Sequence, residues 1–386
     1  MIIQPTTLII SISIILLAFV TPFFNPFFRW KRIVRRSKPE NENDTTNESL
    51  PPVSIVITTH DNAQELVRNL SSIINQDYPT DFQVIVVMEK GDNETEDVLK
   101  RYADNKHLYT TFIPDSSRYM SRKKLAVTLG VKAAKHEWIV LMEAFCVPTS
   151  EKWLETLAHN FQNDKHLVIG YTGFDDETPD YYKFERLRTF CYTAREAIKG
   201  TTYRSCGHCV SFRKSDFMAA NGYSGNLHLI RGEYDFLVNK YAQRGTTGVE
   251  TAEEAWLREE SPSLKTWRND HLFYLETRKF LKRSRLHRAL YNIDMWLMYG
   301  NYVAICVAFT YGIIDDDWVI NASAGAALLI TLVTRTIFAH QVTTQFNENI
   351  GFWKIIPYEL SLIWHSATNR LRYLSADKND FTSHKL

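Results

Sequence analysis

The sequence predicts an α/β fold with a mainly parallel sheet flanked by helices, set between N- and C-terminal hydrophobic segments. Two observations lead to this prediction. Strand-like and helix-like segments alternate from residue 51 to residue 142, a pattern typical of a parallel sheet. The long uncharged runs lie at the two ends of the chain and not in its middle, which is the pattern of a water-soluble domain carried on membrane helices.

The charge balance excludes one class of partner. Lys and Arg number 45 against 44 Asp and Glu in 386 residues. Such a balance gives no overall field that would attract a nucleic acid, and no basic run interleaved with aromatic residues is present. We therefore expect no nucleic-acid partner.

The first segment is an uncharged run from Met1 to Phe28. It is long enough to cross a hydrocarbon core, which takes about 20 residues, so we expect residues 1–28 to form a transmembrane anchor. A cleaved signal peptide is the alternative, but its basic residues would precede the apolar run, whereas here they follow it. By the positive-inside rule, these basic residues place the linker 29–50 in the cytoplasm.

Folded structure is expected to begin at Pro51, after the polar end of this linker. β-branched runs predict strands, and apolar residues at helical spacing predict helices. The expected elements are strand 53–58, helix 63–75, strand 82–87, helix 94–102, strand 109–113, helix 123–134 and strand 138–142. Ligands of open parallel sheets bind at the carboxyl ends of the strands. A site is therefore expected after Ile57, Val87 and Met142.

A second basic cluster, at residues 278–288, precedes another uncharged run, from Met295 to Ile314. An acidic turn follows, and the chain then returns through a further apolar run, so residues 291–339 are expected to form a transmembrane hairpin. Arg335 is expected to extend to the cytoplasmic boundary. The domain at residues 51–290 would then lie in the cytoplasm, in an integral membrane protein.

The C-terminal segment, residues 340–386, is expected to hold an interfacial helix and a cytoplasmic tail. Its apolar part, from Phe352 to Trp364, is interrupted by Lys354, Pro357 and Glu359. The uncharged runs between them are too short for a span, so the segment is expected to lie in the membrane interface.

The five cysteines are expected to be free thiols, because the domain that holds most of them is placed in the reducing cytoplasm. Cys206 and Cys209 form a C-G-H-C sequence. The alternative hypothesis for the protein is therefore a membrane thiol oxidoreductase that uses these two cysteines. A redox pair would open a helix, whereas the strand-like run Val210 to Phe212 follows here. No second Cys/His pair at zinc-ligand spacing occurs in the sequence.

The start of the domain carries a recognisable pattern. It consists of P-P-V-S-I-V-I-T-T-H-D-N from Pro51, the apolar positions Leu66, Leu70 and Ile73, the run Gln76 to Pro79, and V-I-V-V from Val84. Together these resemble the opening of family 2 glycosyltransferases. The resemblance implies the GT-A nucleotide-diphospho-sugar transferase fold.

It also implies that a nucleotide-sugar donor is held by the positions that match Thr58, His60, Asn62 and Glu89. Neutral donors and acceptors read a base edge, and a carboxylate accepts from a base N–H or a ribose hydroxyl. The alternative for His60 and Asn62 is a turn that caps the following helix.

The next two motifs concern the donor diphosphate. The run from Ser121 resembles the family's helix that begins with a basic residue, and Lys123 is the matching position; a solvated lysine is the alternative. W-I-V-L-M-E-A-F-C-V-P from Trp138 is similar to the family's strand and D-x-D motif, whose acids bind a divalent cation, Mg²⁺ or Mn²⁺. Here the two positions hold Glu143 and Phe145. Only Glu143 is then left as a metal ligand, and weak binding is expected.

The run R-G-E-Y-D-F from Arg231 stands at the place of the family's acidic motif. Inverting transfer needs a carboxylate that removes the acceptor proton, but the matching position is Tyr234, a phenol that stays protonated at neutral pH. We assign the base to Asp235, with Glu233 as the second candidate. The alternative is that both acids only stabilise a helix N-terminus. The Q-x-x-R-W motif of processive members is absent near Trp267, so processive synthesis is not expected.

The resemblance thus implies a membrane-bound inverting glycosyltransferase of polysaccharide biosynthesis. It would move a sugar from a nucleotide-diphosphate donor to a lipid-linked or glycan acceptor at the cytoplasmic face. Because three motifs are altered, the alternative is a catalytically silent GT-A domain that serves as a scaffold or binding subunit in membrane glycan assembly.

Overall fold

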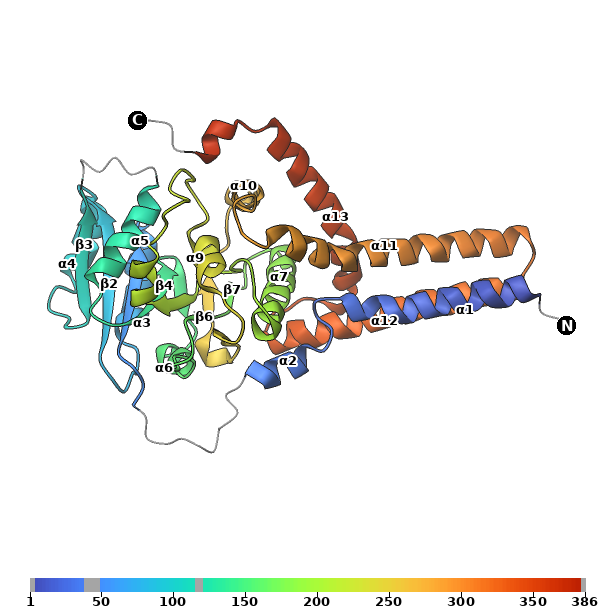
Figure 1. Ribbon diagram of the computed structural model, residues 1–386, viewed down its shortest axis with the longest axis horizontal. Coiled ribbons are helices and arrows are strands. Elements are labelled where there is room, and N and C mark those ends of the chain that lie inside the picture. Colours follow the sequence, from blue (N-terminus) through green and yellow to red (C-terminus); the bar gives the residue numbers. More distant parts are fainter. Residues whose placement is uncertain (1–3, 38–48, 115–120, 383–386) are drawn as a thin grey trace. The chain divides into compact units, whose positions relative to one another are not determined.

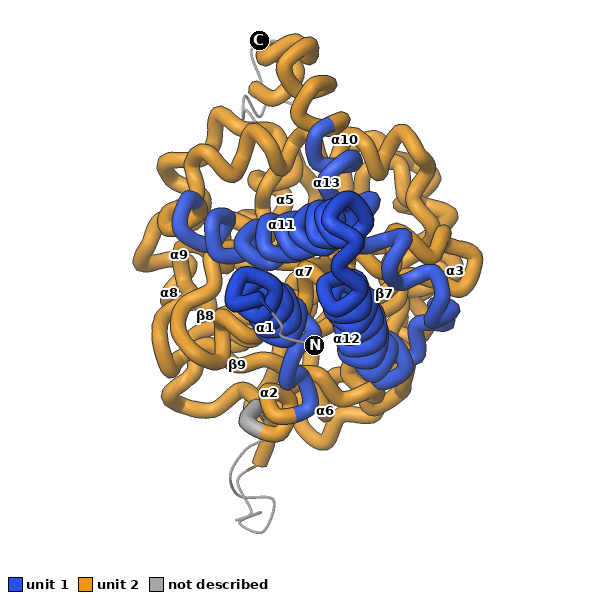
Figure 2. The backbone as a smooth tube through the Cα atoms, turned by 90° about the vertical axis from the view of Figure 1, so that its right-hand side faces the viewer, with its two compact units in different colours: residues 1–31, 285–367 blue, residues 32–284, 368–386 orange. Residues whose placement is uncertain are grey.

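The structure is a computed structural model that describes residues 4–37, 49–114 and 121–382. The chain divides into two compact units. Figure 2 shows residues 1–31 with 285–367 as one unit and residues 32–284 with 368–386 as the other. The larger one holds the predicted α/β domain.

This α/β unit is built on a seven-stranded sheet with strand order β3-β2-β1-β4-β8-β6-β9 (Figure 1). The strands are β1 (Val53–Thr58), β2 (Phe82–Glu89), β3 (Leu108–Ile113), β4 (Trp138–Glu143), β6 (Leu167–Ile169), β8 (Val210–Arg213) and β9 (Thr247–Val249). The strands β1 to β4 pair in parallel. Only β8, between β4 and β6, runs antiparallel to its neighbours.

A second, three-stranded sheet has the order β5-β10-β7. Its strands are β5 (Cys146–Pro148), β7 (Thr172–Phe174) and β10 (Leu257–Glu259). Because β5 follows β4 almost directly, the chain passes from the first sheet into the second just beyond the carboxyl end of β4. Side chains from both sheets therefore meet there.

The helices of this unit complete the α/β pattern. They are α2 (Trp30–Ser37), α3 (Ala63–Ile74), α4 (Asn93–Lys100), α5 (Arg122–Ala133), α6 (Trp153–Ala158), α7 (Asp180–Lys199), α8 (Lys214–Ala219), α9 (Glu233–Tyr241) and α10 (Leu264–Thr277). The alternation predicted from residue 51 to residue 142 is confirmed. The predicted mainly parallel α/β fold is thus the observed one.

The sheet is the core of the unit. Every residue of β1 and β4 is buried, which is why these strands read as continuous apolar runs. Helix α5 lies close to the sheet at Gly130, where an added Cβ would come within 2.5 Å of Val56 Cγ1. This close contact fixes the helix that carries Lys123 against the strand that ends at Thr58.

The other unit consists mainly of α1 (Pro5–Val20), α11 (Ser284–Ile314), α12 (Trp318–Gln345) and most of α13 (Phe352–Ser375). Among the residues that the structure describes, three segments are long and apolar enough to cross a membrane: Pro5–Phe24, α11 and α12. Small side chains such as Ala18, Ala308 and Ala324 let these helices pack closely. At one end, Thr7 donates to Asp317 Oδ2 at 2.6 Å. The apolar runs predicted from the sequence are therefore helical.

The expectation for Arg335 is wrong. Instead of extending to the boundary, its side chain is only 1% exposed. It lies 3.0 Å from Asp294 Oδ1 of α11 and 2.6 Å from Glu359 Oε2 of α13, and Asn25 donates to the other oxygen of Glu359 at 2.7 Å. The cation is retained inside the unit because two buried carboxylates compensate its charge, which sequence spacing does not reveal.

Candidate functional site

The predicted site positions meet at the carboxyl edge of the sheet. In register, Thr58 at the end of β1 lies beside Val87 of β2 and Glu143 of β4. Thr58 and Glu143 are buried. Glu89 is the last residue of β2 and follows Val87 by two positions. The side chains at this edge form two groups.

The first group centres on Glu89. Its Oε1 accepts from Arg122 Nε at 2.8 Å and lies 3.2 Å from His60 Nδ1. Asn62 occupies the N-cap position of α3, but its side chain makes no capping hydrogen bond, so capping does not account for this residue. Asp61, between His60 and Asn62, has a φ of 54°, a left-handed conformation that is uncommon outside glycine. The loop after β1 thus presents His60 beside Glu89.

The second group centres on Lys123, in the first turn of α5. Its Nζ lies 2.5 Å from Glu143 Oε1 and 3.2 Å from Glu233 Oε1, while the lysine side chain remains 24% exposed. Burial pulls the pKa of Lys123 down, but the two carboxylates outweigh burial and the pKa is raised. Lys123, Glu143 and Glu233 therefore form an ion-pair cluster on one side of the edge.

The cluster depends on how α9 begins. Gly232, at its N-cap, has a φ of 94°, and an added Cβ would lie 2.8 Å from Thr277 Cγ2. This position therefore requires glycine. The turn directs Glu233 to Lys123. Burial acts to raise the pKa of Glu233, but Lys123 and Arg231 reverse this and the pKa is lowered.

Asp235 points to a different set of partners. It is only partly buried, and its Oδ1 accepts from the Ser205 N–H at 3.1 Å. Burial raises the pKa of Asp235 to about 6, against the opposing effects of Arg204 and the Ser205 N–H. A carboxylate that titrates near neutral pH suits a general base. Glu233, by contrast, is engaged by Lys123.

Tyr234 lies between these two acids and is buried. Burial, and next the neighbouring Glu143, raise its pKa well above the ordinary value. The ring contacts His208 edge-on, with centroids 5.1 Å apart. Tyr234 is therefore a neutral packing residue and supplies no base.

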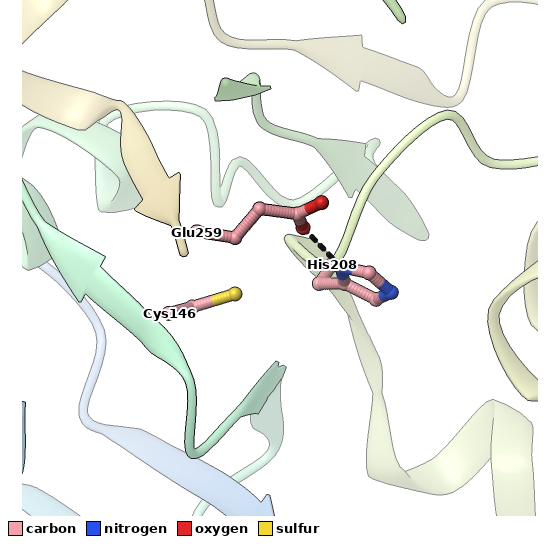
Figure 3. Close-up of side chains that lie close together, drawn as sticks. All are labelled: Cys146, His208 and Glu259. Carbon is pink, nitrogen blue, oxygen red and sulfur yellow. Dashed lines mark hydrogen bonds and ion pairs between the residues drawn. The ribbon is translucent and has the colours of Figure 1, made fainter. Parts of the chain in front are cut away.

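A further cluster lies where β5 and β10 meet the loop before β8 (Figure 3). The ligand atoms of Cys146, His208 and Glu259 all lie within 4.8 Å of one another. Glu259 is, however, already paired with His208 Nδ1 at 2.6 Å and with Arg186 at 2.7 Å. Burial raises the pKa of the Cys146 thiol well above the ordinary value. An ion here would have to displace an arginine and ionise that thiol, so we treat this cluster as a structural network.

The two thiols of the C-G-H-C sequence contact different residues. Cys206 Sγ donates to the Arg186 carbonyl at 3.3 Å, and Cys209 packs against Gly170, where an added Cβ would lie 2.6 Å from its Sγ. Burial raises the pKa of Cys206 to about 11 and that of Cys209 to about 12. All five cysteines are free. Thiols with such pKa values are poor nucleophiles at neutral pH.

The residues present do not fit a divalent cation at the D-x-D position. Hard cations need several oxygen ligands. Glu143 contributes one carboxylate, whose Oε1 lies at the Lys123 ammonium. Phe145 holds the second position, and its ring lies edge-on to His208, with centroids 5.2 Å apart. We therefore derive no chemical step through a metal.

Sequence reasoning missed two residues that act on the site. Arg122 stands beside the predicted Lys123 and pairs with Glu89. Arg204 acts through its charge on Asp235. Arg122 could have been found, because it belongs to the same helix start. Arg204 lies far along the chain from Asp235 and carries no local signal.

Comparison with solved structures defines the class of fold. The structure of the mannosyltransferase PcManGT from Pyrobaculum calidifontis, in complex with GDP-Man and Mn²⁺, is similar with a TM-score of 0.52 and 16% identity, covering 93% of this chain and 99% of that one. The structure of residues 1–349 of TarS from S. aureus with UDP-GlcNAc has a TM-score of 0.44 and 10% identity, covering 81% and 92% of the two chains. The first likeness shows the GT-A glycosyltransferase fold.

The family follows from the sequence comparison. The sequence model of the family described as Glycosyl transferase family 2 matches residues 54–219. This part of the chain is therefore similar to glycosyltransferase family 2, in agreement with the motifs. The match contains β1, β2, β4 and the start of α5, and it ends before α9. No curated protein matches the chain.

Proposed function

We propose that the protein is a membrane-bound inverting glycosyltransferase that moves a sugar from a nucleotide-diphosphate donor to a lipid-linked or glycan acceptor at the cytoplasmic face. One observation carries the proposal. At the carboxyl edge of a domain similar to family 2, Lys123, Glu143 and Glu233 form an ion-pair cluster, and the helix turn that supplies Glu233 also carries Asp235, whose pKa is about 6.

The two groups at the edge suit the two halves of a nucleotide sugar. Glu89, with His60 beside it, has acceptor oxygens for ribose hydroxyls or a base N–H. Thr58 and Asn62 border this group at the end of β1 and the start of α3. Lys123 and Arg122 begin α5, where ammonium and guanidinium groups attract a diphosphate. We therefore place the nucleoside near Glu89 and the diphosphate near Lys123.

The transfer itself needs a base and a stabilised leaving group. The acceptor hydroxyl oxygen forms the new bond to the anomeric carbon, while the bond from that carbon to the diphosphate oxygen breaks on the opposite side, so the configuration inverts. Asp235 accepts the hydroxyl proton and later passes it to water. Lys123 partly neutralises the charge that develops on the departing nucleoside diphosphate.

The membrane part of the proposal is supported by charge. In the described part of the chain, three helices are apolar enough to cross a membrane, and basic residues lie beside them at 29–38 and 278–288. These clusters favour a cytoplasmic position for both ends of the domain. A membrane-held acceptor at the cytoplasmic face would then lie on the same side of the membrane as the domain.

Release of nucleoside diphosphate tests the proposal. The purified full-length protein, in nanodiscs, is supplied with GDP-mannose, then with other GDP- and UDP-sugars, with and without a polar-lipid extract as the acceptor source. We expect one donor to be consumed faster when the extract is present. Absence of release with every donor, despite nucleotide binding, would instead support the silent scaffold.

A further inference from the structure

The D-x-D position of this domain is already occupied by a positive charge. Lys123 Nζ lies 2.5 Å from Glu143 Oε1, the strand-end carboxylate, and 3.2 Å from Glu233 Oε1 on α9. The exposed fractions of the two glutamate side chains are 3% and 6%. Two nearly dry carboxylates are costly unless a cation compensates them, and here the cation is part of the chain.

The surroundings disfavour a metal ion at the same point. A divalent cation would face repulsion from the Lys123 ammonium unless that side chain left both carboxylates. Arg231 adds positive charge that acts on both Lys123 and Glu233. Phe145 offers a hydrocarbon ring where the motif would supply a second carboxylate. Both the local charge and the types of side chain present therefore disfavour a divalent cation at this point.

Lys123 nevertheless retains capacity for a ligand. An ammonium has three N–H donors, and the Lys123 nitrogen has two carboxylate oxygens within 3.2 Å. The side chain is 24% exposed at the carboxyl edge, so a donor remains that can reach a ligand there. Glu233 Oε2 is buried without a hydrogen-bond partner among the residues that the structure describes, and it is a second open position for a ligand hydroxyl.

We propose that the Lys123 ammonium, held by Glu143 and Glu233, takes the place of a divalent cation in binding the donor diphosphate, so that donor binding is independent of metal. This inference rests on the proposed function. Glu143 and Glu233 then act as positioning residues that hold the ammonium, and no protein ligand set for Mg²⁺ or Mn²⁺ remains at this site.

Donor titration in the presence and absence of metal is the first test. Calorimetry on the full-length protein in detergent uses GDP, UDP and their sugars, first with EDTA and then with excess Mn²⁺. We expect the two affinities to agree within about threefold. Binding that disappears in EDTA and returns with Mn²⁺ would overturn the inference and leave the proposed function intact. No binding in either condition would overturn both.

Variants separate the charge from the fold. Lys123→Met should lower donor affinity at least about tenfold in EDTA, whereas Lys132→Met, at an exposed position of the same helix, should not. Because Lys123→Met leaves two carboxylates uncompensated and can unfold the domain, Lys123→Arg is the second variant. It keeps the charge and should keep binding that is insensitive to EDTA. Loss of that insensitivity in a folded Lys123→Arg protein would contradict the inference.

Metal binding without a nucleotide gives a readout that does not depend on the donor. Electron paramagnetic resonance with Mn²⁺ alone compares the unmodified protein with the double variant Lys123→Ala, Phe145→Asp. The variant removes the ammonium and restores a second carboxylate, so it should bind Mn²⁺ more tightly than the unmodified protein. Equal or tighter binding by the unmodified protein would show that the ammonium does not hold the site.

Discussion

The substitution Asp235→Asn should slow the reaction and stabilise the fold at the same time. As the proposed base, Asp235 must be ionised to accept a proton, and an amide cannot replace it. Turnover should therefore fall on the order of 10²-fold or more. Asparagine keeps the size of the side chain and an oxygen that can accept from the Ser205 N–H, so little rearrangement is expected.

The stability gain follows from the pKa. The pKa of Asp235 is raised from 3.8 to about 6, mainly by burial. A carboxyl whose pKa is higher in the folded state binds more protons there, so its ionisation destabilises the fold fully above about pH 6 and not at all below about pH 3.8. The difference is roughly two pKa units, or about 3 kcal/mol. Allowing for partial exposure, Asp235→Asn should raise the free energy of unfolding by about 1–3 kcal/mol at pH 7.

Two assays test this prediction. Chemical unfolding at pH 7 and near pH 4 should show a gain at the first pH that disappears at the second. In the unmodified protein, kcat/KM should fall about tenfold for each pH unit below about 6, since only the ionised base is active. Glu233→Gln is the control from the same helical turn, and it should lose stability because Lys123 loses a partner. If Asp235→Asn keeps its turnover, the assignment of the base is refuted; if it loses stability at pH 7, the argument from the raised pKa is refuted.

Three further predictions concern topology, thiols and the buried arginine. Reporter fusions should place residue 150 in the cytoplasm and residue 316 outside; the reverse placement would contradict the basic-cluster argument. A Cys206→Ser, Cys209→Ser double variant should keep its fold and nucleotide binding, and a fold that fails only under reducing conditions in the unmodified protein would contradict the reading of free thiols. Arg335→Met should lower the unfolding free energy in detergent by about 3–5 kcal/mol. Neutralising its two carboxylate partners as well should recover most of this loss. If Arg335→Met alone causes no loss, the ion pairs do not contribute to stability.

The fold was predictable because its main elements carry a local signal. The strands β1, β2 and β4 are buried apolar runs between turn formers, and their parallel order follows from the helices between them. The strands β5, β7 and β10 have three residues each, too few for any period to be read. The second sheet was therefore missed.

The site was predictable only in part. The ends of parallel strands meet at one edge, so Thr58, Glu89 and Glu143 could be grouped from the sequence. Which charges pair there could not be read. Glu233 joins Lys123 from a helix far along the chain, and Arg335 meets carboxylates of two other helices. Such pairs are fixed by tertiary packing and produce no recognisable spacing in the sequence. For this reason the sequence predicts Arg335 at the membrane boundary and not in a buried ion pair.

Binding of a donor nucleotide at the carboxyl edge is the central claim, and calorimetry on the full-length protein and its Glu89→Gln variant tests it most directly. A hydrogen bond to a charged group contributes about 1.5–3 kcal/mol. We predict saturable binding of GDP or UDP to the unmodified protein and affinity about ten- to a hundredfold weaker in the variant. Failure of both nucleotides to bind, or equal affinity in the two proteins, would contradict the placement of the nucleoside beside Glu89.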